Sequence, residues 1–387
     1  MTSTTSSALV ENLMQAASEQ ERLFDFGGGS FIAPMTRLFH ALDTEANLTE
    51  QGWLGVQADA NRWLANRLRI QRDLAKHPEI AEEVVNDPIV IVGVPRTGTT
   101  KLHRMMGQDM GVQTLAFWQN LNPAPFPDAR PGGPDPRLVL AQGYVDQLST
   151  AFPDLLNLHE FVAEEPEEEV ILLEMSCRSP SAGLFFDIPS FQSWLVAESQ
   201  VPLYEELKLL LQYQQWQNGG RQSRPWVLKS PMHLGRIAAL LEVFPEATVV
   251  HCHRDMASSM ASLCNLVEAA RRMRSDTVDS RELGAFILDF CSSEWERNLE
   301  QRAQSRRQSQ LLDVSYKAIH ENPVKVIREI YGSRDQRLSE EAETAMLAWA
   351  ERNLPRAKPL VNPPDHYAVT PEAVASAFAA YNDRFDT

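Results

Sequence analysis

The chain has 387 residues, 43% hydrophobic and 23% charged, which is the composition of a globular protein with a sizeable buried core. Its formal net charge of −16 argues against a nucleic-acid polymer as partner, because no general positive field surrounds the protein. Any anionic ligand therefore requires a local cluster of cations. No apolar run reaches the ~18 residues of a membrane span, and the opening MTSTTSSALV has neither the basic nor the apolar region of a signal peptide.

The cysteines bear on the compartment. Their spacing fits neither a metal site nor a disulfide framework, so we expect buried free thiols in a reducing compartment. This expectation makes the protein cytoplasmic. The four positions are Cys177, Cys252, Cys264 and Cys291.

Residues 1–86 are predicted to form a helical extension packed on the core. Apolar residues recur there on helical stripes that include Trp53, Trp63 and Leu64. Residues 87–387 are then predicted to form one α/β domain that includes the C-terminal helices.

The segment PIVIVGVPRTGTTKLHRMM predicts a strand, a phosphate-binding loop and a helix in that order. Its β-branched run begins at Ile89, and the helix is expected over Thr99–Asp109. The glycine spacing is that of GxxxxGK[ST], but Thr99 stands where the motif has Lys. The cation sits earlier, at Arg96. A nucleoside triphosphate with Mg²⁺ normally needs the missing Lys against its terminal phosphates, whereas a less charged leaving diphosphate could be held by Arg96, hydroxyls and the helix N-terminus.

Two segments after this helix are harder to interpret. Residues Asn120–Pro136 are rich in Pro and Gly, which indicates a loop that is either a lid over a site or a surface connection. Pro166, followed by three Glu and VILLEM, predicts the start of a helix with carboxylates on its dipole.

Further strand–loop–helix units follow at Trp226–Phe244, Ala247–Met273 and Leu311–Tyr331. Short buried strands that alternate with amphipathic helices indicate an α/β fold with a P-loop-like, doubly wound parallel sheet flanked by helices. More helices are expected near Glu341–Asn353 and after Pro371.

Three cations each follow a predicted strand: Arg96, Lys229 and Arg254. Ligands bind beyond the carboxyl ends of strands in an open parallel sheet, where these side chains are expected to meet. Any one of them alone would be interpreted as a surface cation, but the three together favour an anion site.

These residues carry a resemblance. PRTGTT at Pro95–Thr100, then LKSP, then Arg254 with Ser262 eight residues later resemble the family of sulfotransferases that use 3′-phosphoadenosine-5′-phosphosulfate (PAPS). The match extends over about Asp87–Tyr331 and is greatest with the bacterial-type branch. It implies sulfuryl transfer from PAPS to a small acceptor, without a metal ion.

The resemblance also implies roles for individual residues. Arg254 and Ser262 would hold the 3′-phosphate, and Lys229 would stabilise charge near the bridging oxygen. The 5′-phosphosulfate would be held by Arg96, Thr97, Gly98, Thr99 and Thr100, with Arg96 also acting in catalysis. The product would be adenosine 3′,5′-bisphosphate.

The chain departs from the cytosolic members of the family at the residue that acts as general base for the acceptor hydroxyl. Those members have a His two residues after the Lys, and here Pro231 takes that position. The candidate base is His159, and its competitors are Glu160, Glu164, Glu165 and Glu168. Their neighbours Glu167 and Glu169 are expected to be solvated at a helix start.

Other polar residues are interpreted as structural or remain open. Burial is expected for His103, His233 and His251. Arg271, Arg272 and Arg274 either reach the nucleotide or form a solvated helix end. Lys101 replaces an apolar residue of the family and receives no role.

Apolar and aromatic residues suggest that the acceptor is a hydrophobic alcohol, phenol or glycolipid. They are Phe117, Trp118, Phe126 and the segment Leu184–Leu195, although most could equally be core residues. Two other functions remain open. One is a P-loop kinase of a small molecule, and the other is a non-catalytic nucleotide- or lipid-binding protein on the same fold.

Overall fold

A parallel four-stranded sheet lies at the centre of the computed structural model, which describes residues 5–127, 135–220, 224–354 and 361–385. The strand order is β2-β1-β3-β4, and every neighbouring pair is parallel. The strands are β1 (Ile89–Val92), β2 (Val227–Lys229), β3 (Thr248–His253) and β4 (Leu311–Ser315). All residues of β1, β2 and β3 are buried, as expected of strands covered on both faces. The predicted α/β class is confirmed.

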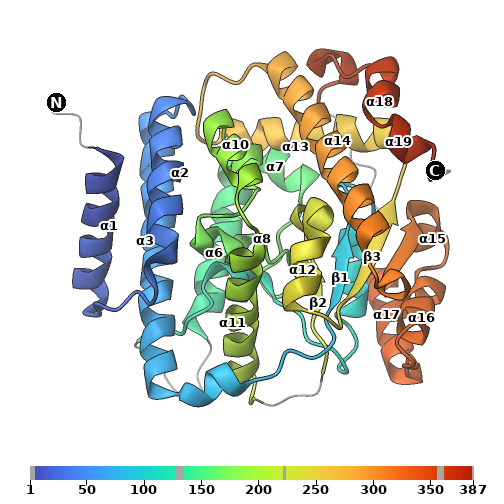
Figure 1. The fold of residues 1–387 in the computed structure, drawn as a ribbon, viewed down its shortest axis with the longest axis horizontal. Coiled ribbons are helices and arrows are strands. Elements are labelled where there is room, and N and C mark those ends of the chain that lie inside the picture. The colour runs from blue at the N-terminus through green and yellow to red at the C-terminus, as the bar shows by residue number, and fades with distance from the viewer. Residues whose placement is uncertain (1–4, 128–134, 221–223, 355–360, 386–387) are drawn as a thin grey trace.

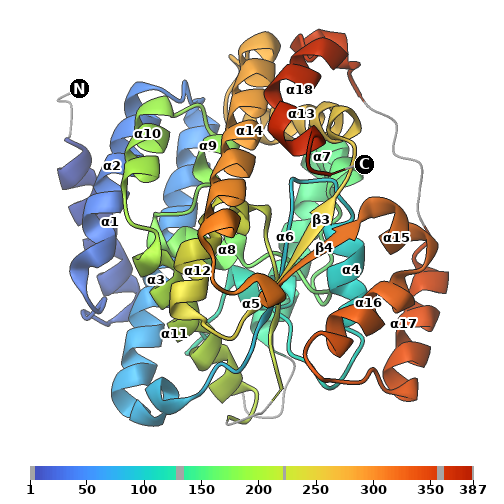
Figure 2. The ribbon, with the colours of Figure 1, turned by 45° about the vertical axis from the view of Figure 1, so that its right-hand side comes forward.

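Helices cover both faces of the sheet (Figures 1 and 2). Alternate residues of β1 point to opposite faces, so that Val90 and Val92 join one hydrophobic cluster while Ile89 and Ile91 join another. The first face carries α12 (Ile237–Val243) and α14 (Ser280–Gln304), and the second carries α4 (Thr99–Met106), α16 (Pro323–Gly332) and α17 (Glu340–Arg352). The helix after the loop thus ends at Met106, three residues earlier than expected.

The N-terminal residues are helical, as predicted, and lie farthest from the sheet (Figure 1). They form α1 (Ser6–Glu21), α2 (Ile32–Thr44) and α3 (Glu50–Lys76). One continuous hydrophobic cluster joins these helices to the first face of the sheet through α11 (Val201–Gln217). The division of the chain at residue 86 stays a prediction.

Two local expectations are corrected. Asn120 and Leu121 end a helix and Pro136 begins another, so the two ends of the expected loop are helical. Residues 122–127 are non-helical, and residues 128–134 lie outside the described part. The helix expected from Pro166 begins at Val170, because Pro166 forms an antiparallel bridge with Ala116 that keeps its surroundings extended.

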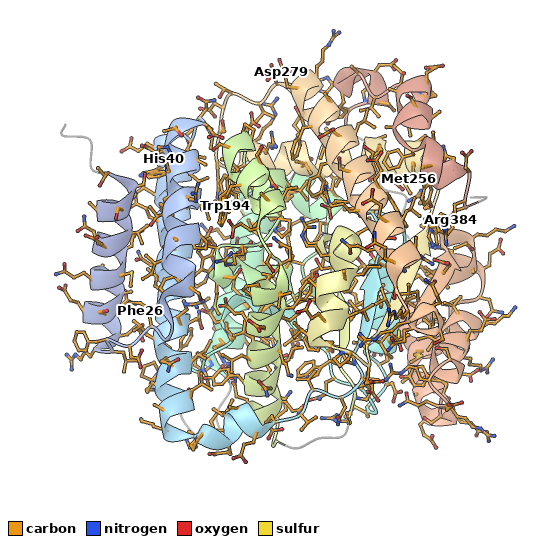
Figure 3. The ribbon with its side chains drawn as sticks, viewed as in Figure 1. Phe26, His40, Trp194, Met256, Asp279 and Arg384 are labelled. Atoms are coloured by element: carbon orange, nitrogen blue, oxygen red, sulfur yellow. The ribbon has the colours of Figure 1, made fainter. Side chains whose placement is uncertain are left out.

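The remaining helices connect these layers. The α-helices are α5 (Phe117–Leu121), α6 (Pro136–Ala151), α7 (Pro153–Leu158), α8 (Val170–Leu173), α9 (Ala182–Phe185), α10 (Pro189–Ala197), α13 (Met256–Arg272), α15 (Tyr316–Glu321), α18 (Pro371–Ala377) and α19 (Ala379–Asn382). The 3₁₀ turns are η1 (Gly29–Phe31), η2 (Pro78–Glu82), η3 (Glu174–Ser176), η4 (Pro231–Arg236), η5 (Gln308–Gln310) and η6 (Pro364–Tyr367). Met256, labelled in Figure 3, begins α13 just after β3.

All four cysteines are buried and free, as predicted. Within the described ranges, no helix combines the length and the apolarity that crossing a bilayer would require.

Candidate active site

The loop between β1 and α4 is shaped by its glycines. Gly98 has φ +88°, a left-handed conformation that a side chain would strain, and it caps the N-terminus of α4. Thr97 is fully buried, and its hydroxyl donates to the carbonyl of Val94 at 2.8 Å, so this side chain holds the loop itself. Arg96 also has a positive φ, of 77°. Positive φ at a non-glycine residue is uncommon and concentrates at functional sites.

Three of the residues predicted for the donor site lie together. Arg96 Nε donates to Ser262 Oγ at 3.0 Å, and Arg254 Nη1 donates to the carbonyl of Arg96 at 2.7 Å. The Arg254 guanidinium also stacks over the Tyr316 ring, 4.1 Å from its centre. The carboxyl ends of β1 and β3 therefore bring two cations and a hydroxyl to one place.

These cations have no carboxylate partner. Within the described residues, Arg96, Lys101 and Arg254 form no ion pair with Asp or Glu. Burial, together with the charge of Arg254, lowers the pKa of Arg96, and burial lowers the pKa of Lys101. In a chain of net charge −16, half-buried cations that lie close together without neutralising carboxylates among the described residues favour an anion at this place.

Lys229 is the third predicted cation and is fully buried at the end of β2. Its Nζ donates to Glu168 Oε1 at 2.5 Å and to Thr100 Oγ1 at 3.3 Å. The hydroxyl of Thr100 belongs to the first turn of α4, so Lys229 lies beside the loop. The structure therefore brings all three predicted cations to the carboxyl edge of the sheet.

His159 is paired with a buried carboxylate. Its Nε2 lies 3.3 Å from Glu167 Oε2, and Glu167 is 1% exposed. Burial alone would raise the pKa of Glu167, but His159, Lys229 and Arg104 hold it well below its ordinary value. A carboxylate only accepts hydrogen bonds, so Nε2 carries the proton and Nδ1 is left as the basic nitrogen.

Glu169 is the second buried carboxylate of this segment. It accepts from His233 Nε2 at 2.5 Å and from the backbone N–H of Lys229 at 2.9 Å. His233 Nδ1 in turn lies 3.0 Å from the Tyr204 hydroxyl. Burial opposes ionisation, but these hydrogen bonds lower the pKa of Glu169. The prediction that Glu167 and Glu169 are solvated is wrong, because the residues just before α8 pack against Lys229 at the end of β2.

Of the four competitors for the role of base, three do not line the cavity described next. Glu160 is 54% exposed and pairs with Arg104, and Glu164 is exposed. Glu165 accepts from the indole N–H of Trp349 at 3.1 Å and does not line the cavity described next. Glu168 does line it.

A cavity of about 200 Å³ opens beside these groups. Its polar end is formed by Arg96, Thr99, Thr100, His159, Glu167 and Glu168. Most of the lining is apolar and includes Phe117, Leu148, Leu155, Phe161, Ile171 and Met232. Leu184 and Phe185 also line it, whereas Trp118 and Phe126 do not. Their rings face the guanidinium groups of Arg137 and Arg69 instead.

The opposite end of the cavity has a charged group that the sequence did not reveal, formed by Asp59, Arg62, Glu174 and Arg274. Arg274 thus serves this end rather than the nucleotide. Arg271 is buried and donates to the carbonyls of Gly183 and Leu184. Arg272 is exposed in the last turn of α13, where it pairs with Glu268, so the expected solvated helix end is found at Arg272 alone.

The three histidines expected to be structural are buried. His103 contacts the carbonyl of Val227 at 3.2 Å, and burial next to Lys229 lowers its pKa to about 4. His251 lies 2.9 Å from the Asn298 amide, and burial lowers its pKa.

Comparison with known proteins places these residues in context. A family model described as "Sulfotransferase family" matches residues 88–339. Among curated proteins, the omega-hydroxy-beta-dihydromenaquinone-9 sulfotransferase Stf3 of Mycobacterium tuberculosis is 26% identical over 263 residues, as is its Mycobacterium bovis counterpart. That alignment covers 65% of this chain and spans 64% of the length of each relative.

Solved structures match over almost the whole chain. The sulfotransferase STF9 from Mycobacterium avium is 27% identical, with a TM-score of 0.85 over 97% of this chain and 96% of that one. The sulfotransferase STF1 from Mycobacterium tuberculosis is 29% identical, with a TM-score of 0.84 over 97% of this chain and 100% of that one.

Proposed function

This chain belongs to the sulfotransferase family, and we propose that it moves the sulfuryl group of PAPS to a hydroxyl of an apolar acceptor. The observation that carries the proposal is the meeting of Arg96, Arg254 and Ser262, where neither cation has a carboxylate partner in the part of the chain that the structure describes. Separate surface cations would point into solvent or pair with the abundant acidic residues.

The residues of this site fit a doubly phosphorylated donor. Arg254 and Ser262 would hold its 3′-phosphate, and the loop with the N-terminus of α4 would hold its 5′ end. The bound donor supplies a sulfuryl group on a phosphate leaving group. Lys229 and Arg96 would stabilise the charge that develops on that leaving group, which is the main catalytic effect expected for an in-line displacement.

His159 is the proposed general base. Its Nδ1 would take the proton of the acceptor hydroxyl, while Glu167 orients the ring through Nε2 and stabilises the imidazolium. Glu168 also lines the cavity, but its carboxylate pairs with Lys229. Because Lys229 engages Oε1 of Glu168, that oxygen is not free to accept the proton of the acceptor hydroxyl, which favours His159.

The acceptor is proposed to be a lipid-like or aromatic alcohol. The cavity next to His159 is mostly apolar, so a polar acceptor such as a sugar would lose hydrogen bonds on entering it. The curated relative is named for a hydroxylated dihydromenaquinone, which is also an alcohol on an apolar molecule.

Ligand binding and transfer test the proposal separately. Adenosine 3′,5′-bisphosphate is expected to raise the melting temperature and Mg·ATP is not, whereas a small-molecule kinase would show the reverse. Arg254→Ala should weaken bisphosphate binding about 10- to 100-fold, the effect of losing a charge-assisted hydrogen bond. Arg272→Ala, at the other end of α13, is the matched control and should bind normally.

Sulfated product from PAPS and a panel of hydrophobic alcohols would support the enzyme. Bisphosphate binding without transfer to any alcohol would instead identify a non-catalytic nucleotide-binding protein. Unchanged bisphosphate affinity in Arg254→Ala would remove the assignment of the 3′-phosphate.

A further inference from the structure

The cavity has a second polar end, which the transfer reaction does not use. Asp59 and Arg62 come from α3, Glu174 begins η3, and Arg274 follows α13. Arg274 Nη2 donates to Asp59 at 2.7 Å, and Arg62 Nη2 donates to the other oxygen of Asp59 at 3.3 Å. Asp59 is therefore satisfied by two guanidinium groups.

Glu174 is much less well paired. Within the described residues its one ion pair is with Arg62, at 3.5 Å, and that guanidinium already bonds Asp59. The indole of Trp63 is a further polar neighbour of Glu174. Burial raises the pKa of Glu174 to about 7, in the same direction as the charge of Asp59 and against the opposing charges of Arg62 and Arg274. A buried carboxyl group in this state has capacity for a further hydrogen bond.

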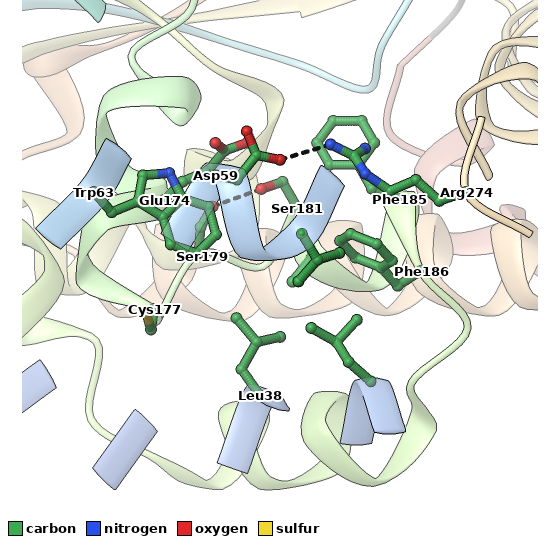
Figure 4. A pocket seen from close by; sticks show the side chains of 13 residues that line it. Leu38, Asp59, Trp63, Glu174, Cys177, Ser179, Ser181, Phe185, Phe186 and Arg274 are labelled. Atoms are coloured by element: carbon green, nitrogen blue, oxygen red, sulfur yellow. Dashed lines mark hydrogen bonds and ion pairs between the residues drawn. The ribbon is translucent and has the colours of Figure 1, made fainter. Parts of the chain in front are cut away.

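Glu174 also borders two cavities. Behind the first lies a smaller one of about 50 Å³ (Figure 4), and the two share Asp59, Glu174, Ser181, Phe185 and Arg274. Figure 4 shows the Asp59–Arg274 pair on one side and apolar Leu38 on the other. A molecule that enters the first cavity at the transfer site and fills it would therefore end at this polar group.

Helix α13 joins the two ends. Leu263, Leu266, Val267 and Ala270 line the cavity at the i, i+3, i+4, i+7 spacing of one helical face. Ser262, which contacts Arg96, and Arg272 are ten residues apart on this helix, a rise of ~15 Å. Arg274, at the second polar end, follows two residues after Arg272, so this end lies at a distance of that order from the Arg96–Ser262 contact. An acceptor that reaches from the transfer site to this end needs an apolar body of comparable length.

We propose that Glu174, with Arg62, Asp59 and Arg274, is a specificity site that binds a second hydroxyl group of the acceptor, at the end opposite the hydroxyl that is sulfated. The acceptor class is an elongated apolar molecule with a hydroxyl at each end. This inference rests on the proposed function, because the first hydroxyl is placed by the transfer site.

Matched acceptors test this inference. Straight-chain primary alcohols and the terminal diols of the same lengths are compared with the full-length protein and PAPS, by kcat/KM. At a length near the ~15 Å span the diol is expected to be preferred about tenfold or more, since a buried polar site discriminates strongly against an analogue that lacks the hydroxyl. In Glu174→Leu this ratio should fall to about one. Glu174→Gln keeps an acceptor oxygen and should retain the preference.

The ratio of kcat/KM for the diol to kcat/KM for the alcohol separates a loss of recognition from a loss of folding, because a damaged fold lowers both values alike. Glu164→Leu, at an exposed position, is the control and should keep the preference. Alcohol sulfation with no diol preference at any length, or an unchanged ratio in Glu174→Leu, overturns the inference and leaves the proposed function standing. No sulfation of either series contradicts both.

Discussion

Glu174 gives a prediction about stability that needs no ligand. Burial raises its pKa from the ordinary 4.5 to about 7. The folded state thus binds the proton more tightly than the unfolded state does. The stability that Glu174 contributes is fully present below pH 4.5 and is lost as the pH rises to about 7. At 1.36 kcal/mol per pKa unit, the loss amounts to about 3 kcal/mol. Glu174→Gln removes this titration, so the variant should gain about 3 kcal/mol relative to the parent between pH 4.5 and pH 8.

The assay is urea unfolding of both proteins at several pH values. The informative quantity is how the difference in unfolding free energy between the two proteins changes with pH. Replacing the carboxylate also changes its contact with Arg62, by an amount that does not depend on pH. Glu164→Gln, at an exposed position, is the control and should show a flat difference. A flat difference in Glu174→Gln, or one that rises toward acid, would refute the reasoning that burial dominates at this carboxyl.

Three further predictions concern separate parts of the chain. His159→Asn should lower kcat by ~10²- to 10⁴-fold with bisphosphate affinity retained, and an unaltered kcat would transfer the role of base to Glu168. Hydrogen bonds from Tyr367 and other groups outweigh burial and lower the pKa of Glu268 to about 2, so Glu268→Gln should destabilise at pH 7 and match the parent as the pH falls toward 2; a gap that persists in acid contradicts this. The four buried thiols, whose pKa values burial raises, should resist a thiol reagent at pH 8 until urea unfolds the protein, and fast labelling of the native state would show that the cysteines open to solvent.

The donor side of the site could be predicted because its signals are local. Glycine spacing, a β-branched run and the residue after each strand are properties of a few neighbouring positions, and parallel strands bring those residues to one edge. Arg96, Lys229 and Arg254 were placed correctly by this rule. The boundaries of the elements were less accurate, since Gly107 ends α4 before the apolar pattern does.

The acceptor side could not be predicted in the same way. Three glutamates after a proline satisfy the local rule for a helix start, but whether a carboxylate is solvated depends on what packs against it. Glu169 meets His233, 64 residues later, and Glu167 meets Lys229, 62 residues later, so no spacing in the sequence signals their burial. The same limit applies to Asp59 and Arg274, whose pairing joins α3 to the end of α13.

The donor side and the acceptor side of the site are also supplied by different parts of the chain. The family match begins at residue 88, and the residues assigned to the donor all lie inside it, whereas Asp59 and Arg62 lie in α3, before it. Helix α3 is fixed to α13 through its backbone: the N–H of Thr49 donates to the carbonyl of Arg274 at 2.9 Å, and a Cβ at Gly52 would lie 2.1 Å from that carbonyl oxygen. Since α13 starts beside Arg254 and ends beside Arg274, it holds the two ends of the cavity at a set separation. Under the proposed function, changes in α3 would therefore alter which acceptors fit without moving the residues assigned to the donor.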